Sequence, residues 1–582
     1  MAGGHARRLQ ARRRIAAAAL VVLIVALGTG GISPTAAGAA AVRTVPGQYA
    51  SIGAAIAAST TGDTIQVAPG TYHASVDFSG KNLTLVATGG PSVTTIDADG
   101  TTGVSIGPAG VISGFTITDG RATFGAGLKV LGAGSVIKGN VFDGNVLDTG
   151  GWGAAIFGNG ASPTIEANVF RHNSCDNQFG AGVMTFVNSS SPYVTDNVVV
   201  DNPCAAINLI EPEDAAGIVA NNTIVRNRAG IVGDLFDSTK QRAFVNNIVV
   251  DNTVGVDLPL APADRPIFNH NLVFGNDTDF AAGTTNATGT NANLSADPRF
   301  VDAATDFHLQ AGSPAIDQGT DDYAPEKDFD QGPRSDDGDG DGIGGEDLGA
   351  YERAAPPLPI ISMGSVSVTE GDAAFQVVTV PLHLSRPYKA PMLLAWSTVA
   401  DSATSPADFT GLSNIFAGFT NGQADMTIQV TVKGDLLDEP NERFHIHMTN
   451  PTNVTLGHDG TVTIVDNDTR PSIVTQGAST RESDDSGHEL DFPVRLSAPS
   501  GKTVSVGYTT SRGTAKPGTD YVTKTGVLTF PPGSTQRMAK VWIRDDRVRE
   551  HTETFTVRYF GPANASIPAA NVRVAGTIVD DD

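Results

Sequence analysis

The sequence predicts an all-β protein, a parallel β-helix followed by two immunoglobulin-like β-sandwiches. Three observations lead to this fold class: a repeated seven-residue phrase in the first half, alternating strand patterns in the second half, and 66 glycines in 582 residues. Glycine permits tight turns, so this number is typical of a chain with many short strands. The length suggests three or four domains.

The balance of charges excludes some classes of function. The chain has 38 Lys and Arg against 62 Asp and Glu, a formal net charge of −24. Such a surface repels nucleic-acid phosphates and anionic lipids, so we expect no nucleic-acid partner. Two cysteines are too few for a disulfide scaffold or a multi-cysteine zinc framework.

Residues 1–41 are predicted to be an export signal. Three arginines at positions 12–14 precede an apolar run over 15–27, and small residues with two A-x-A cleavage patterns follow. A bilayer span needs roughly 20 residues, more than this run supplies. An uncleaved membrane anchor is the alternative, and the arginines leave Sec and twin-arginine export both open. We expect the mature chain to have no membrane span and to be extracellular or at the cell surface.

The first half contains a repeat. A seven-residue motif recurs with Asn as its second and seventh residues. The first of these two, which we call the first-phase Asn, lies at positions 140, 168, 197, 222, 247 and 271, and the second Asn follows five residues later. Coils of a parallel β-helix stack about 4.8 Å apart, so residues at one phase form a ladder. Asn suits such a turn because it tolerates the left-handed conformation and its amide can bond to the next Asn. We therefore expect all twelve Asn to be structural rather than ligand-binding.

The two cysteines test this register. Cys175 and Cys204 each lie seven residues after a first-phase Asn, at 168 and 197. They therefore share a phase in consecutive coils, with Cα atoms about 5 Å apart, within disulfide range. We predict a coil-to-coil disulfide; two free buried thiols are the alternative.

Both ends of the repeat resemble a known family. Residues 49–58 have the pattern of a short capping helix and precede Gly62-Asp-Thr-Ile-Gln-Val-Ala-Pro-Gly-Thr-Tyr72, which resembles the start of many pectate-lyase-like right-handed parallel β-helices. Residues 306–317 and 347–352 resemble the closing motif of bacterial β-helix surface proteins. The resemblance covers residues 42–353. It implies the fold but not an activity, because β-helices include lyases, hydrolases, epimerases and adhesins.

Candidate chemistry on the β-helix is sparse. Asp148 and Asp176 share a phase, which places two carboxylates close enough for a calcium site or for one raised pKa. We favour the alternative that both are solvated loop residues, so they are weak candidates for catalysis. Lys129, Lys138, Arg171 and His172 are possible bases nearby, and nothing in the sequence selects among them. The solenoid has no motif series like that of polygalacturonases or alginate epimerases.

Aromatic residues form a second series on the repeat. Phe124, Trp152 and Phe179 are each followed by Gly-Ala. We expect these rings to pack in the core, and a sugar-binding platform of stacked rings is the alternative.

An acidic loop follows the repeat. Asp337, Asp339 and Asp341 alternate with glycines and resemble the first half of a calcium loop, although Leu348 stands where the twelfth-position Glu is expected. We predict a partial calcium-binding loop, with a flexible acidic turn as the alternative.

The second half is predicted to hold two sandwiches. Residues 354–359 form a stiff, proline-rich linker, and strand patterns then fill 360–468 and 471–582. In the second segment, Gly513-Thr-Ala-Lys-Pro-Gly-Thr-Asp-Tyr521, Gly526-Val-Leu-Thr-Phe530 and Glu553-Thr-Phe555 resemble the Calx-beta family. This resemblance implies carboxylates that gather at one end of each sandwich and bind Ca²⁺.

The resemblance also implies the calcium ligands. In the second domain they are Glu482, Asp520, Asp545, Asp546, Glu550, Glu553, Asp580, Asp581 and Asp582, with the Val548 carbonyl as a further candidate. In the first domain they are Glu370, Asp408, Asp435, Glu439, Glu442, Asp466 and Asp468. Gly434 and Asn467 depart from the pattern, so we expect the first domain to bind fewer ions or to bind them more weakly. A solvated acidic rim is the alternative, but so many converging carboxylates would repel one another without cations.

The sequence therefore predicts an exported calcium-binding cell-surface or secreted protein. The β-helix would bind a glycan or another surface partner, and the tandem Calx-beta domains would act as calcium-stiffened adhesion or communication modules. The alternative is an extracellular polysaccharide lyase or glycoside hydrolase that acts at the β-helix face.

Overall fold

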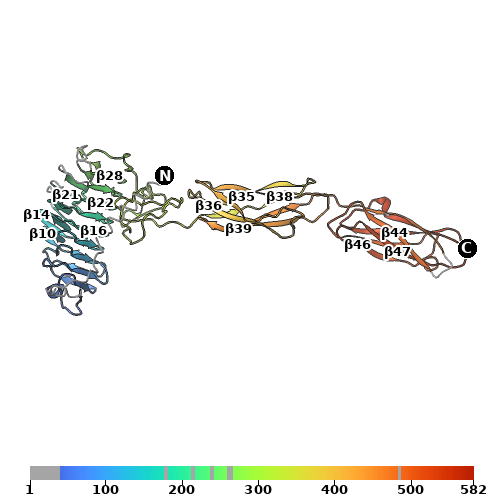
Figure 1. Ribbon diagram of the computed structural model, residues 1–582, viewed down its shortest axis with the longest axis horizontal. Coiled ribbons are helices and arrows are strands. Elements are labelled where there is room, and N and C mark those ends of the chain that lie inside the picture. The colour runs from blue at the N-terminus through green and yellow to red at the C-terminus, as the bar shows by residue number, and fades with distance from the viewer. Residues whose placement is uncertain are drawn as a thin grey trace, which may run out of the picture. The chain divides into compact units, whose positions relative to one another are not determined.

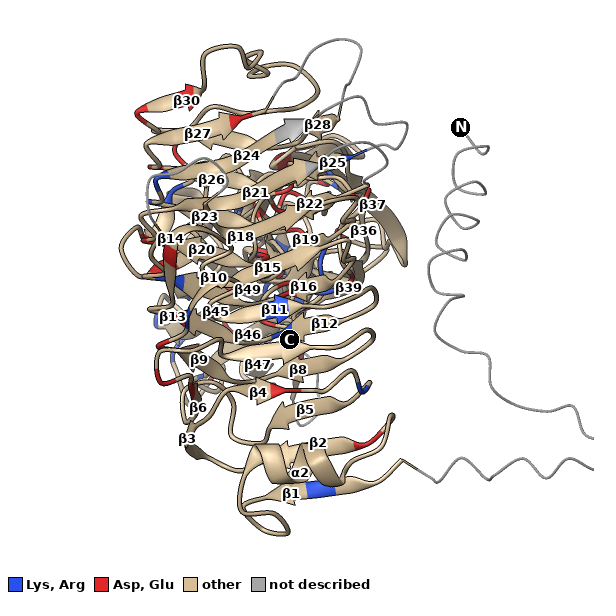
Figure 2. Ribbon diagram, turned by 90° about the vertical axis from the view of Figure 1, so that its left-hand side faces the viewer, with Lys and Arg blue, Asp and Glu red and all other residues tan. Residues whose placement is uncertain are grey.

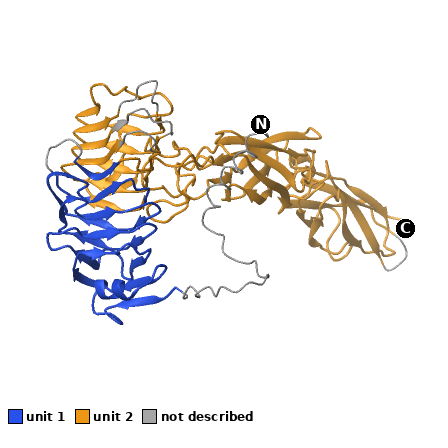
Figure 3. Cartoon of the chain, turned by 60° about the vertical axis from the view of Figure 1, so that its left-hand side comes forward, with its two compact units in different colours: residues 1–164, 171–187 blue, residues 165–170, 188–582 orange. Residues whose placement is uncertain are grey.

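The computed structural model describes residues 40–175, 181–211, 216–235, 242–258, 266–482 and 487–581, most of them in strands and turns (Figure 1). It divides into two compact units, residues 1–164 with 171–187 and residues 165–170 with 188–582 (Figure 3). Apart from its last two residues, the predicted export signal lies outside the described residues. Within the described part of the chain, no helix is long and apolar enough to cross a membrane.

Three parallel sheets make up the predicted β-helix, and in each sheet the strands follow in chain order. The first contains β1 (Val42–Val45), β2 (Thr64–Val67), β5 (Thr84–Ala87), β8 (Val111–Ser113), β12 (Val136–Lys138), β16 (Thr164–Glu166), β19 (Tyr193–Thr195), β22 (Ile218–Ala220), β25 (Ala243–Val245) and β28 (Ile267–Asn269). The second contains β3 (Gly70–His73), β6 (Thr94–Asp97), β9 (Thr116–Thr118), β13 (Val141–Asp143), β17 (Val169–Arg171), β20 (Val198–Val200), β23 (Thr223–Val225), β26 (Ile248–Val250) and β29 (Leu272–Phe274). The third contains β4 (Val76–Asp77), β7 (Val104–Ile106), β11 (Leu128–Val130), β15 (Ile156–Asn159), β18 (Gly182–Val187), β21 (Ala205–Glu211), β24 (Ala229–Leu235), β27 (Val254–Asp257) and β30 (Thr278–Phe280).

The strands are short because each coil turns after a few residues. Their central side chains face the core: Ile112 and Ile137 pair in register on β8 and β12, and both are fully buried. Two further strands, β10 (Arg121–Phe124) and β14 (Val146–Trp152), pair with each other in a separate two-stranded sheet. The predicted β-helix is therefore confirmed.

A short helix lies at the start of the β-helix, as predicted. Helix α2 spans Ile52–Ala58, and the hydroxyl of Ser51 caps it by accepting a hydrogen bond from the amide of Ala54 at 3.2 Å. Ile52, Ala55 and Ile56 are buried. These three residues lie on one side of the helix, which therefore covers the apolar end of the first coils.

Both asparagine series form ladders. In the first series, Asn222 donates to the side-chain oxygen of Asn247 at 3.0 Å and to the carbonyl of Val194 at 3.0 Å. In the second, Asn202 donates to Asn227 at 2.9 Å in the same way. The first ladder continues one step beyond the prediction, because Asn271 donates to Asn293 at 3.2 Å. These bonds satisfy buried amides, so the structural interpretation of the Asn is confirmed.

Neither cysteine is free. Cys175 and Cys204 are both disulfide-bonded, and they are the only two cysteines in the sequence. The bond joins the two positions that the repeat register paired.

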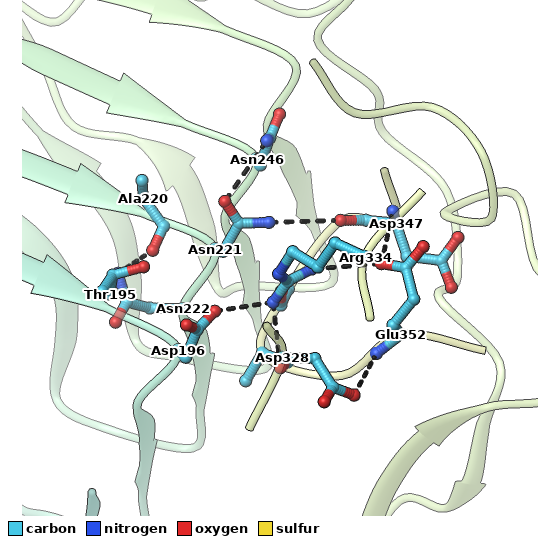
Figure 4. Close-up of polar contacts among 12 residues, drawn as sticks. Thr195, Asp196, Ala220, Asn221, Asn222, Asn246, Asp328, Arg334, Asp347 and Glu352 are labelled. Carbon is cyan, nitrogen blue, oxygen red and sulfur yellow. Dashed lines mark hydrogen bonds and ion pairs between the residues drawn. The ribbon is translucent and has the colours of Figure 1, made fainter. Parts of the chain in front are cut away.

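The segment after the solenoid is held by a buried arginine (Figure 4). It begins with the antiparallel pair β31 (Phe300–Asp302) and β32 (Asp306–Leu309). Arg334, whose side chain is 1% exposed, donates to Asp196 at 2.6 Å and to Glu352 at 3.2 Å. Glu352 also accepts a hydrogen bond from the amide of Asp347 at 3.0 Å. Burial raises the pKa of Asp196 to about 7 and that of Glu352 to about 9.

Two sandwiches follow the predicted linker. The first has one sheet of β38 (Asp425–Val432), β35 (Gln376–Leu384), β33 (Ile360–Met363) and β40 (Thr455–Leu456), and another of β34 (Val366–Thr369), β41 (Gly460–Val465), β39 (Glu442–Thr452), β36 (Met392–Ala400) and β37 (Ile415–Phe419). The second has one sheet of β42 (Ile473–Thr475), β44 (His488–Leu496) and β47 (Gln536–Ile543), and another of β43 (Ala478–Arg481), β49 (Arg573–Val579), β48 (Glu553–Ala563), β45 (Val504–Ser511) and β46 (Thr525–Phe530), with a 3-10 helix at Ala569–Asn571.

The two sandwiches share a core arrangement. Phe409 stacks on Phe444 at 4.1 Å in the first, and Tyr521 stacks on Phe555 at 4.4 Å in the second. In each pair, one ring precedes an edge strand and the other lies near the start of a central strand. Sequence-distant loops are therefore held at the same end of each sandwich.

Candidate calcium sites

The predicted ligands of the first sandwich lie where strand ends meet. Strands β34 and β41 run parallel, and β39 runs antiparallel to β41, so the ends of β34 and β41 lie beside the start of β39. Glu370 follows β34, Glu442 opens β39, and Asp466 and Asp468 follow β41. The fold itself thus brings carboxylates from distant parts of the sequence to one edge.

All seven predicted ligands of this sandwich come together. They form three overlapping groups whose carboxylate oxygens lie within 4.8 Å of one another: Glu370 with Asp435 and Glu439, Glu370 with Asp466 and Asp468, and Asp408 with Glu439 and Glu442. Carboxylate oxygens at such spacing are the donor set that Ca²⁺ prefers.

Carboxylates in this group of seven predicted ligands have raised pKa values, as expected for negative charges that lie close together. Burial, followed by the charges of Asp435 and Glu439, raises the pKa of Glu370 to about 7. Burial and the neighbouring Asp408 raise the pKa of Glu442 to about 7. The Oδ2 atom of Asp468 is buried and has no hydrogen-bond partner in the described structure. A bound cation would favour the ionised carboxylates and so counteract both causes of these raised pKa values, burial and the repulsion between neighbours.

The two departures in the first sandwich have physical causes. A Cβ atom at Gly434 would lie 1.9 Å from the carbonyl oxygen of Gly371, so the backbone leaves no room for a carboxylate there. Asn467 accepts a hydrogen bond from the amide of Gly371 at 2.7 Å and donates to Asp372 at 3.1 Å. Asn467 therefore closes the loop instead of adding a charge.

The second sandwich places its predicted ligands on the equivalent loops. Glu482 follows β43, Asp520 lies between β45 and β46, and Glu553 opens β48. The remaining predicted ligands lie on the loop between β47 and β48 or after β49, namely Asp545, Asp546, Glu550, Asp580 and Asp581. Asp582 lies outside the described residues, and Asp581 is exposed.

The acidic edge of the second sandwich shows the same electrostatic pattern. Burial, followed by the charges of Asp546 and Glu550, raises the pKa of Glu482 to about 7. Burial and the neighbouring Asp520 raise the pKa of Glu553 to about 7. The Oε2 atom of Glu553 and the Oδ1 atom of Asp580 are buried without a hydrogen-bond partner among the described residues.

A histidine that the sequence analysis did not single out also reaches this edge. The Nδ1 atom of His488 lies 3.0 Å from Asp545, whose side chain is fully buried. In the first sandwich Gln376 opens the equivalent strand, β35, and Gly434 occupies the position of Asp545. The amide of Val548 donates to Asp546 at 2.8 Å, which positions that loop.

The acidic loop after the solenoid is only partly as predicted. Carboxylate oxygens of Asp337 and Asp339 lie within 4.8 Å of each other and of Asp317, a residue that the sequence analysis did not include. Asp341 instead forms an ion pair with Lys389. Asp317 lies twenty residues before the loop, and no spacing rule connects it to the alternating pattern.

The candidate carboxylate on the β-helix is already paired. Asp148 forms an ion pair with Arg121 at 3.0 Å between β14 and β10, and Asp176 lies outside the described residues. In the aromatic series, Phe124 and Trp152 are in contact at 6.1 Å, and Phe179 also lies outside the described residues. Phe157, which the repeat pattern did not suggest, contacts Phe124 at 5.2 Å.

Comparison with known proteins agrees with this architecture. The family model described as Calx-beta domain matches residues 358–468 and 469–582, and the one described as right handed beta helix region matches residues 87–234. The sodium/calcium exchanger Calx of Drosophila melanogaster is 40% identical over 78 residues, which are 13% of this chain and 8% of that protein. The extracellular matrix organizing protein FRAS1 of Mus musculus is 28% identical over 150 residues, 24% of this chain and 4% of that protein.

The crystal structure of the apo form of the Calx CBD1 domain is 28% identical, with 20% of this chain covering all of that chain at a TM-score of 0.18. The chain spans less than a tenth of the length of the two relatives named above. Residues 358–468 and 469–582 are therefore two Calx-beta domains, related to the calcium-binding domains of sodium/calcium exchangers, and they follow a right-handed β-helix.

Proposed function

We propose that this chain is an exported calcium-binding protein of the cell surface or extracellular space, whose β-helix binds a glycan or another surface partner. The tandem Calx-beta domains hold Ca²⁺ at their acidic edges and act as calcium-stiffened adhesion or communication modules. The proposal includes no nucleic-acid partner, because the net charge is −24, and it includes no membrane span of the mature chain.

The observation that carries the calcium proposal is the convergence of carboxylates in both sandwiches. Glu370 and Glu482 occupy equivalent positions, are nine-tenths buried, and have a pKa raised to about 7 by burial and by neighbouring carboxylates. Burying several acceptor-only groups together is unfavourable unless a cation binds between them. Asp317, Asp337 and Asp339 form a smaller candidate site of the same chemistry.

Two observations support the proposed extracellular location: the name of one relative and the disulfide bond. The mouse relative is named as an extracellular matrix protein, and the Cys175–Cys204 disulfide is typical of oxidising compartments. The enzymatic alternative has less support, because Asp148 is held in an ion pair with Arg121.

Calcium titration by isothermal calorimetry tests the proposal. We expect several binding events in the full chain, and the pair Asp546→Ala with Glu550→Ala should remove those of the second sandwich. Matched changes in the first sandwich, Asp435→Ala with Glu439→Ala, should remove a smaller or weaker set, because Gly434 and Asn467 replace two of its carboxylates. Absence of calcium-dependent heat from the unaltered chain would refute the proposal.

A further inference from the structure

A histidine and two aspartates, none of them a predicted calcium ligand, meet at one end of the second sheet of the β-helix. His73 is the last residue of β3 and Asp97 is the last residue of β6, and the two strands pair in register so that these residues stand opposite each other. Figure 2 shows β3, β6, β9 and β13 stacked in this order. Asp99 follows in the turn after β6. The pairing of consecutive coils therefore brings the three side chains together.

The three ligand atoms have the spacing of donors around a small metal ion. The Nδ1 atom of His73 lies 3.1 Å from Oδ1 of Asp99 and 3.4 Å from Oδ2 of Asp97. One ligand atom from each residue lies within 4.8 Å of the other two. Donors that are bound at about 2.0–2.2 Å in tetrahedral or octahedral geometry lie about 2.8–3.6 Å apart. A single ion can therefore contact all three side chains after small side-chain movements.

The turn after β6 orients the carboxylates. The amide of Asp99 donates a hydrogen bond to Oδ1 of Asp97 at 3.1 Å, so the other oxygen of Asp97 faces the imidazole. The amide of Ala98 donates to the carbonyl of Thr118 at 3.0 Å, which ties this turn to the next coil. The side chain of Asp97 is 24% exposed, whereas those of His73 and Asp99 are both 61% exposed. The backbone therefore holds the cluster in place, and the cluster is accessible to ions in solution.

The same sheet contains a second histidine–aspartate contact that needs no metal. Asp143 ends β13, two coils after β6. Its Oδ1 atom lies 2.9 Å from Nδ1 of His172, and its Oδ2 atom lies 2.9 Å from Nε of Arg171. One carboxylate there faces an imidazole and a guanidinium, so the polypeptide itself supplies the counter-charge.

The balance of charge at His73 is the reverse. Within the described part of the chain, the only ion-pair partner of Asp97 and of Asp99 is His73. Two carboxylates that face one imidazole leave a net negative charge, even when the imidazole is protonated. A divalent cation bound together with the neutral imidazole balances both carboxylates.

We propose that His73, Asp97 and Asp99 bind a divalent transition-metal ion such as Zn²⁺. Imidazole nitrogen suits Zn²⁺, Ni²⁺ and Cu²⁺, whereas Ca²⁺ takes oxygen ligands, so the donor set distinguishes this site from the carboxylate sites of the sandwiches. Three protein ligands leave at least one coordination position for water or for a donor group of another molecule. The proposal is independent of the proposed function, because it involves neither the calcium sites nor a glycan.

Isothermal calorimetry of the full chain with Zn²⁺ tests the proposal. Saturating Ca²⁺ is present throughout, so that it competes for the sandwich carboxylates. We expect a zinc-binding event whose affinity His73→Gln lowers by about 100-fold or more, because loss of a group that only orients a metal ligand already costs about 10- to 100-fold. Asp97→Asn with Asp99→Asn should have an effect of the same size.

The matched control is His172→Gln. The side chain of His172 is 62% exposed, follows β17 of the same sheet and contacts a single carboxylate, so its loss should leave zinc affinity unchanged. Co²⁺ gives a second readout, because its visible absorption should change on binding to the unaltered chain and to this control but not to His73→Gln. Thermal unfolding of every variant without metal shows that the β-helix is intact.

Two results would overturn the proposal. If the unaltered chain binds no Zn²⁺ under these conditions, the cluster is an ion pair and not a metal site. If Zn²⁺ binds but His73→Gln and the double aspartate variant behave like His172→Gln, the ion lies elsewhere on the chain. Neither result affects the calcium proposal, which the titration with Ca²⁺ tests separately.

Discussion

The β-helix and the two sandwiches bury polar groups in opposite ways. In the β-helix, Asn residues within the ladders donate to one neighbouring Asn and accept from another, as Asn222 does between Asn197 and Asn247. In the sandwiches, most of the buried polar side chains are carboxylates, and buried oxygens of Asp468 and Asp580 have no partner among the described residues. An amide can satisfy another amide, but a carboxylate only accepts. The ladder amides therefore satisfy one another within the polypeptide, whereas the proposed sandwich sites depend on a cation to supply the missing partner.

The largest expected effect is the removal of calcium. Each bound ion at a concentration 100-fold above its dissociation constant adds about 2.7 kcal/mol of stability, so several ions shift unfolding strongly. Chelation should lower the melting temperature of the sandwiches and leave that of the β-helix unchanged, as measured by differential scanning calorimetry.

A control variant tests whether the calcium response comes from the predicted ligands rather than from any carboxylate on the surface. Glu489→Gln removes an exposed carboxylate that pairs with Lys540 at 2.6 Å, and it should leave the calcium response intact. A β-helix transition that falls together with the sandwich transitions would contradict the division between the two regions.

The next largest effect is expected from removing one residue of the first asparagine ladder in the β-helix. Asn222→Ala removes a buried amide that donates to Asn247, Val194 and Ala220 and that accepts from Asn197. Because it leaves several buried groups unpaired, we expect a loss of about 3 kcal/mol in the free energy of unfolding at saturating calcium. Urea unfolding followed by circular dichroism measures it.

The matched control for the ladder is Asn286→Ala. Asn286 is exposed and accepts a single local hydrogen bond from Thr288 at 2.9 Å, so its loss should change stability by less than about 0.5 kcal/mol. Equal effects of the two substitutions would mean that the ladder adds nothing beyond its local turn.

Reduction of the disulfide is expected to have a comparable or smaller effect. Cross-links of this loop length typically add about 2–4 kcal/mol. A reductant should therefore lower the melting temperature of the β-helix but not the calcium response of the sandwiches. Mass spectrometry of native protein that finds two alkylated thiols would contradict the bond.

The smallest effect is a dependence on pH without calcium. The pKa values of Glu370 and Glu482 are about 7 in the folded chain, above the ordinary value of 4.5. Between these values the folded state binds more protons than the unfolded state, so stability should fall as the pH rises from 4.5 through 7. Melting temperatures at pH 5 and pH 8 in chelator measure the difference.

The paired variant Glu370→Gln with Glu482→Gln should flatten this dependence. Saturating calcium should also reduce it, because the ions replace the protons. A calcium-free chain whose sandwiches become more stable at pH 8 would contradict the assigned direction.

Periodic features could be predicted from the sequence, and features without a period could not. The Asn ladder and the cysteine pair follow from counting residues per coil, since stacking places equal phases together. The sandwich carboxylates follow from their positions at strand ends in a recognised family. Asp317 and Phe157 were missed because their partners, Asp337 and Phe124, lie at unrelated sequence distances.

The sequence by itself determined the all-β class, the coil register, the cysteine pairing and which carboxylates end which strands. Only the tertiary structure decided which groups pair with which. It paired Asp148 with Arg121 and placed Asp317 beside the acidic loop. A repeat determines where a backbone turns, whereas the partner of a charge depends on distances between side chains that only the folded chain defines.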